Sequence, residues 1–234
     1  MTSVGYHSGY GVPVTMEENL REVRLAVERL RLSVPGFQGA KYSEFFLEQI
    51  ESGLIVLPIK AERWSVMLRW TRLFSGGYLA ALKCVAGVLG RQQSFDGSVL
   101  EKMDDRVQIQ LARKTGEILV AATAKQNECD ILIVPVQLGL NYQGQSLEDV
   151  HSKLGDDEAG IDLLNLLVQL LNYPLRLKSH EDLWMDCGGT RLMPDWSRSA
   201  PFLRVQKTQL ELKLGDPADD SGGSGVATFF SCWQ

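Results

Sequence analysis

The strongest constraint on the fold is a nearly all-apolar segment in the last third of the chain. Across residues 161–173 most side chains are Leu, Ile or Val, and the polar ones are Asp162, Asn165, Gln169 and Asn172. Their steps of three and four place them in one narrow stripe on a helix that is otherwise apolar. Such a helix must be surrounded by protein. We therefore expect a buried helix over 159–173, ended by Pro174.

The composition is that of an ordinary globular protein. The chain has 234 residues, of which 44% are hydrophobic and 23% charged. Its net charge of -5 argues against general affinity for nucleic acid or anionic membranes. The four cysteines are far apart and form no C-x-x-C pair, which indicates reduced thiols and a cytoplasmic location.

The sequence gives no indication of membrane insertion or secretion. No segment reaches the roughly 18 apolar residues that a spanning helix needs. Residues 1–14 lack the basic region and apolar run of a secretory signal. We therefore expect a soluble protein that makes no membrane contact.

Helical patterns dominate the first half of the chain. Thr15 and Glu18 have the spacing of a capping box, and Pro35 follows the helical pattern that begins there. Apolar periodicity predicts four further elements: helices over 42–51, 62–74 and 78–89, and a short buried strand over 54–59.

Strand patterns are more frequent in the second half. They predict a strand over 131–136, which Pro135 would place at an edge or a bulge, a hairpin over 202–214 and a last strand over 226–230. Residues 99–124 fit either a helix or a hairpin. The helical spacing over 100–111 fits slightly better.

Together these patterns predict an α+β fold. We expect a helix-rich N-terminal half to pack with a small, mostly antiparallel sheet from the C-terminal half, around the buried helix 159–173. The polar, Gly-containing stretch 90–98 is the predicted boundary between a mainly helical region, 1–97, and an α+β region, 98–234. One continuous domain is the alternative.

The densest group of reactive side chains follows the buried helix, at His180, Glu181, Asp182, Asp186 and Cys187. An imidazole beside carboxylates can bind a divalent cation or act in acid–base catalysis where these groups converge. The candidate catalytic residues are therefore His180, Asp182, Asp186 and Cys187, and the candidate metal ligands are His180, Glu181 and Asp186. We favour the alternative that this segment starts a helix, with Ser179 as its N-cap and Asp182 in its first turn.

Cys187 is a candidate nucleophile, and Gly188 and Gly189 would let a backbone approach it closely. A nucleophilic Cys needs a lowered pKa, commonly from a nearby imidazole, and the chain offers His7, His151 and His180. A buried thiol in the core is the commoner situation for a free cysteine, and it is the interpretation we favour.

Two segments suggest contact with a macromolecule. The Gly-rich N-terminus carries Tyr6, His7 and Tyr10, residue types that form adaptable contact surfaces. The predicted helix 62–74 places Arg69 and Arg72 beside tryptophans, a combination that can bind phosphate and stack on bases. The alternative is that the tryptophans belong to the core and the arginines extend to water.

These observations favour a non-catalytic subunit or adaptor that acts through protein–protein contact in a larger cytosolic assembly. A protein partner or a homo-oligomer is expected, and no cofactor is predicted. The first alternative is a small hydrolase or metal-dependent enzyme that uses the segment His180–Cys187. The second is a subunit that contacts nucleic acid through the face Arg63–Arg72.

Overall fold

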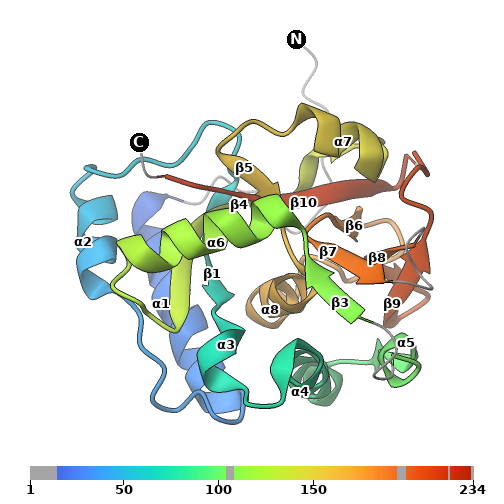
Figure 1. The fold of residues 1–234 in the computed structure, drawn as a ribbon, viewed down its shortest axis with the longest axis horizontal. Coiled ribbons are helices and arrows are strands. Elements are labelled where there is room, and N and C mark those ends of the chain that lie inside the picture. Colours follow the sequence, from blue (N-terminus) through green and yellow to red (C-terminus); the bar gives the residue numbers. More distant parts are fainter. Residues whose placement is uncertain (1–14, 104–107, 194–198, 221, 233–234) are drawn as a thin grey trace.

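The computed structural model describes residues 15–103, 108–193, 199–220 and 222–232, and it has the predicted α+β architecture (Figure 1). Its main layer is a mixed sheet of eight strands. The strand order is β1 (Arg63–Leu68), β4 (Ile131–Gln143), β10 (Ser224–Phe230), β6 (Trp184–Cys187), β8 (Ala200–Gln206), β9 (Gln209–Gly215) and β2 (Phe95–Asp96), while β5 (Glu158–Gly160) pairs with β10. A small second sheet consists of β3 (Gln108–Leu111) and β7 (Thr190–Met193).

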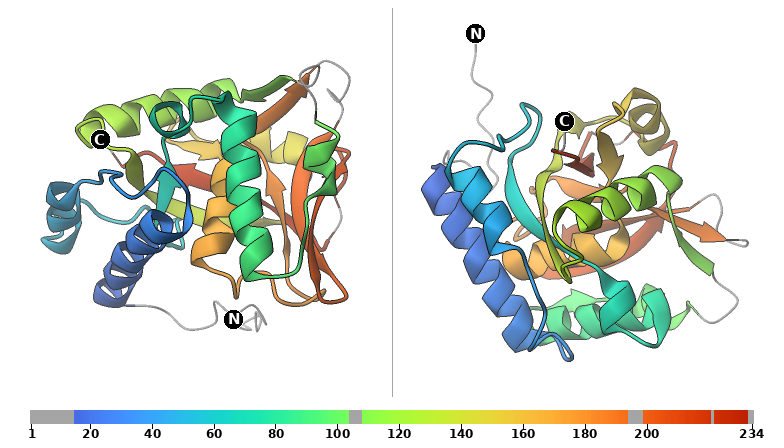
Figure 2. Two further views of the ribbon diagram at one scale, coloured as in Figure 1. Left: turned by 90° about the horizontal axis from the view of Figure 1, so that it is seen from below. Right: turned by 60° about the vertical axis from the view of Figure 1, so that its left-hand side comes forward.

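The helices surround this sheet. They are α1 (Met16–Ser33), α2 (Glu44–Glu51), α3 (Trp70–Leu73), α4 (Gly77–Gln92), α5 (Ser98–Glu101), α6 (Arg113–Lys125), α7 (Leu147–Lys153) and α8 (Leu163–Asn172). In Figure 1, α1 and α2 lie on the left, α6 crosses the front, and α8 and α4 are seen nearly end-on, while Figure 2 gives the same elements from two other sides. None of the helices in the described residues is long and apolar enough to cross a bilayer.

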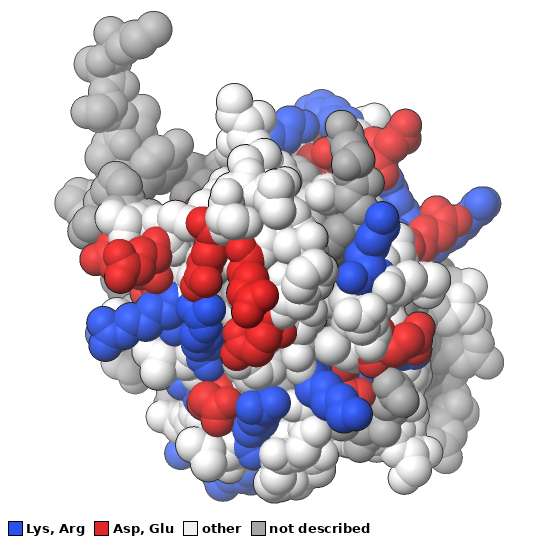
Figure 3. Space-filling view, turned by 90° about the vertical axis from the view of Figure 1, so that its left-hand side faces the viewer, with Lys and Arg blue, Asp and Glu red and all other residues white. Residues whose placement is uncertain are grey.

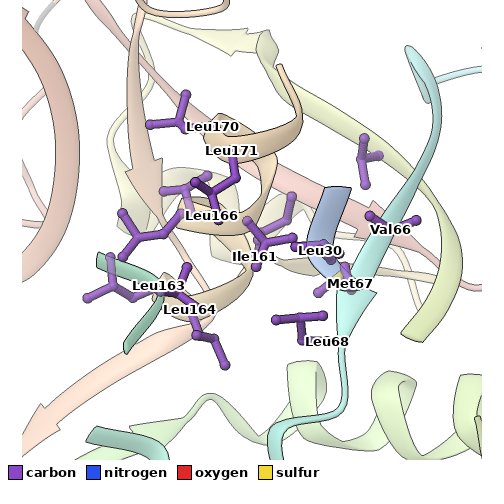
Figure 4. Close-up of a cluster of buried hydrophobic side chains, with 14 of the residues drawn as sticks. Leu30, Val66, Met67, Leu68, Ile161, Leu163, Leu164, Leu166, Leu170 and Leu171 are labelled. Atoms are coloured by element: carbon purple, nitrogen blue, oxygen red, sulfur yellow. The ribbon is translucent and has the colours of Figure 1, made fainter. Parts of the chain in front are cut away.

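The buried helix predicted from the sequence is α8, and all ten of its residues are buried. Figure 4 shows leucines of α8, among them Leu166 and Leu171, in one buried cluster with Met67 of β1 and Leu30 of α1. The helix starts later than predicted. Residues 158–160 form β5 on β10, and the side chain of Asp162 caps α8 by accepting the N–H of Asn165.

The polar stripe of α8 covers the free edge of the sheet. Because β1 is an edge strand, the backbone groups that face away from β4 need other partners. Asn165 Oδ1 accepts the N–H of Leu68 at 2.6 Å, and Gln169 Nε2 donates to the carbonyl of Val66 at 2.9 Å. From α1, Asn19 bonds both the N–H and the carbonyl of Trp64, at 2.8 and 3.0 Å. Side-chain amides therefore make the hydrogen bonds to β1 that a neighbouring strand would otherwise make.

The predicted helix over 62–74 is wrong, because residues 63–68 form β1 and only Trp70–Leu73 are helical. All six residues of β1 are buried, since α1 and α8 both pack against this strand. A strand buried on both faces shows no alternation of polar and apolar residues. Its apolar spacing therefore resembled that of a helix.

Two other predicted elements are also wrong. Residues 54–59, predicted as a buried strand, form an irregular loop whose outward side chains are exposed. Residues 108–111, placed in a helix, form β3, which pairs with β7. The hairpin alternative for 99–124 also fails, because residues 113–125 form α6.

Several predictions from local patterns are confirmed. Thr15 and Glu18 form the capping box of α1. The hairpin over 202–214 is β8 and β9, and the last strand is β10. The strand at 131–136 is the start of β4, which lies between β1 and β10, so Pro135 does not mark an edge strand.

The sheet crosses the predicted boundary at residue 97. The strands β1 and β2 come from the first region and pair with β4 and β9 of the second, in antiparallel and parallel register respectively. The division into 1–97 and 98–234 stays a prediction.

Candidate interaction surface

The segment that follows α8 forms a turn and not the start of a helix. The Oδ2 atom of Asp182 accepts the N–H groups of Lys178 and Ser179 at 2.6 and 2.8 Å, so this buried carboxylate holds the turn together. His180 and Glu181 are exposed at its tip. The helix start predicted here is wrong because the chain leaves the turn directly into β6.

Asp186 lies on β6, away from this turn. It lines a small hollow with Asp216, Asp219 and Ser224, and His180 is not among the lining residues. Burial raises the pKa of Asp186 to about 6, and the charge of Asp219 adds to the shift. Within the described part of the chain, no three His, Cys, Asp or Glu side chains are placed to hold a metal ion.

Cys187 is buried in the core. Its thiol donates to the carbonyl of Ile161 at 3.3 Å, and burial raises its pKa to about 12. A nucleophilic thiol needs a lowered pKa, so the shift is opposite in sign. Another predicted base, His151, lies on α7, and its Nε2 is 2.9 Å from the carbonyl of Gly188. His7 lies outside the described residues.

The basic residues predicted on one helix face have acidic partners where the structure describes them. Arg63 is buried in β1, forms an ion pair with Glu22 at 3.0 Å and stacks over the ring of Tyr173. Arg69 follows β1 and pairs with Glu128 at 2.7 Å. The side chain of Arg72 lies outside the described part of the structure.

The remaining predicted contact residues, Tyr6, His7 and Tyr10, lie outside the described residues. The face that carries α1 and α2 shows positive and negative side chains next to one another (Figure 3). Arg24, for example, reaches from α1 to Glu51 of α2 at 2.7 Å. Mixed charge of this kind is typical of a solvated surface.

The most unusual surface feature is the connection between α2 and β1, which we call the apolar loop (residues 54–60). It runs along the upper left of the molecule in Figure 1. The exposed fractions of Leu54, Val56 and Ile59 are 76%, 70% and 102%. The residues between them, Ile55 and Leu57, pack against the core. The loop thus presents three large apolar side chains to solvent from an anchored backbone.

Local hydrogen bonds fix both ends of the apolar loop. After α2, Gly53 adopts a positive φ of 73°, and the N–H groups of Leu54 and Ile55 both donate to the carbonyl of Gln49. At the other end, Ala61 donates to the carbonyl of Pro58 at 2.9 Å. Gly53 and Pro58 were the features of the sequence that could have indicated a loop instead of a strand.

A hollow of about 440 Å³, here called the loop hollow, lies beside these side chains. Its lining consists of loop residues together with residues of β5 and of the end of β10: Leu54, Ile55, Val56, Pro58, Ile59, Lys60, Asp157, Glu158, Phe230, Ser231 and Cys232. The buried carboxylate of Glu158 accepts the hydroxyl groups of Tyr142 and Thr228 at 2.8 and 2.6 Å. Lys60 Nζ lies 3.5 Å from it. The hollow thus combines apolar residues with the charged pair of Lys60 and Glu158 and with a second carboxylate, Asp157.

Comparison with known proteins does not identify a function, so the function has to be inferred from the structure. No family model matches the chain, and no match is found among curated proteins or among solved structures.

Proposed function

We propose that this protein is a non-catalytic subunit or adaptor of a larger cytosolic assembly and that it binds a partner protein through the apolar loop. The observation that carries the proposal is the simultaneous exposure of Leu54, Val56 and Ile59 on one anchored loop. Clustered exposed apolar side chains are a feature of interaction sites, whereas scattered ones are common on any surface.

The energetics favour a bound state for this loop. Burying one such side chain stabilises a complex by about 1.5–3 kcal/mol. Because Ile55 and Leu57 already hold the backbone against the core, little conformational entropy remains to be lost on binding. An apolar side chain of the partner would enter the loop hollow against Phe230, while Lys60 at the rim would meet a polar group.

The test compares two sets of exposed apolar residues. In the test variant, Leu54→Ser, Val56→Ser and Ile59→Ser are combined. The control is Leu32→Ser on α1, where an equally exposed leucine (84%) does not line the loop hollow. Proteins captured from a cell extract by each form are compared, and a captured protein is then purified and titrated.

The proposal expects a partner that wild type and Leu32→Ser bind alike and that the triple variant binds at least about tenfold more weakly. A partner bound equally by the triple variant would contradict it. So would a strictly monomeric wild-type protein, judged by light scattering at micromolar concentration, that captures nothing.

A further inference from the structure

A second and larger hollow lies between α6, α7 and β5. We call it the α6 groove, and its volume is about 760 Å³. Its lining residues are Ala112, Arg113, Lys114, Thr115, Glu117, Ile118, Ala121, His151, Leu154, Asp156, Ala159, Gly160, Gly188, Arg191 and Ser231. The volume is within the range of small-molecule sites, about 300–1,000 Å³. The two hollows share Ser231 in their linings, but Arg113, Lys114 and Arg191 line only the α6 groove, and the inference depends on these three residues.

Three cations and two carboxylates line the α6 groove, in a chain whose net charge is negative. Arg191 of β7 is exposed and forms no ion pair with any described residue. Lys114 Nζ donates to the carbonyl groups of Leu154 and Gly155 and has no carboxylate partner among the described residues. Two cations at this groove therefore form no ion pair with the described residues, although the carboxylate of Asp156 also lines the groove.

The third cation, Arg113, uses only part of its guanidinium group. It bonds Glu117 through Nε at 2.8 Å, which leaves both Nη groups available to a ligand. His151 lies on the other side of the groove, at the end of α7. Since the carbonyl of Gly188 can only accept, the Nε2 atom of His151 is the donor of their bond, and Nδ1 remains available.

Apolar side chains continue the lining beyond the cations. Ile118 and Ala121 lie one to two turns further along α6 than Lys114, and Ala159 of β5 also lines the groove. Two other lining residues connect α6 to β5, because the hydroxyl of Thr115 donates to the carbonyl of Gly160 at 2.9 Å. The groove thus offers cationic donors and an apolar wall within one fixed frame.

We propose that the α6 groove binds a small organic phosphate, with Arg191 and Lys114 on the phosphate and the wall formed by Ile118 and Ala121 against its organic part. A guanidinium group matches two oxygens of a phosphate at once, and charge-assisted bonds of this kind are the strongest that a surface groove offers. A phosphate ion alone would fill a small part of the volume, which is why the ligand is assigned as organic.

The test uses phenyl phosphate and inorganic phosphate as probes, titrated by ³¹P NMR at low ionic strength because salt screens exposed charges. The test variant is Arg191→Gln, whose side chain makes no ion pair with the described residues and whose loss should leave the fold intact. Arg21→Gln, an exposed arginine on α1 outside the groove, is the control with the same change in net charge.

The proposal expects phenyl phosphate to bind more tightly than inorganic phosphate, and Arg191→Gln to weaken its binding about tenfold while Arg21→Gln leaves it unchanged. A second variant, Lys114→Gln, should weaken binding to a similar extent. Equal binding by Arg191→Gln and Arg21→Gln would overturn the site. Equal affinity for the two probes, or no binding at millimolar concentration, would overturn the assignment of an organic phosphate.

Discussion

Two apolar segments of this chain differ in their burial. Every residue of α8 is buried, whereas the apolar loop exposes Leu54, Val56 and Ile59. The difference lies in the polar atoms that accompany them. Asn165 and Gln169 of α8 bond the free edge of β1, so the helix satisfies backbone groups as it buries its leucines. No comparable polar stripe interrupts the apolar loop. Apolar content alone therefore does not decide burial, and the polar residues within an apolar segment indicate what it packs against.

The largest loss of stability is expected from breaking the contact between α8 and β1. In Asn165→Ala, the N–H and carbonyl of Leu68 lose their side-chain partner, and the carboxylate of Asp162 loses a donor at 2.7 Å. Because all these groups are buried, we expect the free energy of unfolding to fall by about 4 kcal/mol.

The matched control for this variant belongs to the other region. Asn141→Ala removes an exposed amide that donates to the carbonyl of Lys60 in the apolar loop. Its cost should stay near 0.5 kcal/mol, since water replaces the bond. Urea unfolding of both variants measures the two losses, and losses of equal size would remove the proposed distinction.

The next effect compares two leucines of the same size. Leu167 is fully buried in α8, and its replacement by Ala should reduce the free energy of unfolding by about 3 kcal/mol because a cavity remains. Leu54→Ala in the apolar loop should change it by less than about 0.5 kcal/mol. Thermal and urea unfolding check both values. If Leu54→Ala lowered the free energy of unfolding by more than about 2 kcal/mol, the side chain of Leu54 would stabilise the fold itself, and its assignment to partner binding would be contradicted.

The carboxylates of Asp162 and Asp186 differ in the hydrogen-bond partners that the fold gives them. Asp162 accepts the hydroxyl of Tyr78 at 2.7 Å and the amide of Asn165, although burial still raises its pKa. For Asp186, burial raises the pKa to about 6, and Ser224 only partly offsets the shift. A raised folded-state pKa means that the stability present below the unfolded-state pKa, about 3.9, is lost as the pH rises to about 6.

Asp186→Asn should remove this pH dependence. Near pH 4 the variant and the wild type should unfold with similar free energies, because the carboxyl is protonated in the folded wild type and about half protonated in the unfolded wild type, which shifts the balance by only about 0.4 kcal/mol. At pH 7 the variant should be more stable by about 2 kcal/mol, a figure reduced for partial exposure of the carboxylate to solvent. Urea titrations between pH 4 and pH 7 measure the difference. A difference that stays constant across this range would contradict the assigned cause.

Much of the fold was accessible from local sequence patterns. The stripe at Asp162, Asn165 and Gln169 identified a buried helix, and alternation identified the hairpin of β8 and β9. The strand β1 was not accessible in this way, because its burial on both faces comes from α1 and α8, which are distant in sequence. Local periodicity carries no information on such contacts.

The candidate sites show the same limit more clearly. Residues 180–187 are close in sequence, yet they include an exposed turn, a buried carboxylate and a buried thiol. Conversely, the α6 groove joins Lys114, His151 and Arg191 from three separate elements, and no motif in the sequence connects them. The apolar loop was visible as an apolar segment, but its exposure depends on tertiary packing.

Hydrogen exchange of individual backbone amides in the isolated protein tests the contrast between α8 and the apolar loop most directly. The N–H of Leu68 belongs to an edge strand, yet Asn165 accepts it within the core, so it should exchange as slowly as amides in the middle of the sheet. The amide of Val56 should exchange orders of magnitude faster. Fast exchange at Leu68, or protection at Val56 equal to that at Leu68, would contradict the account.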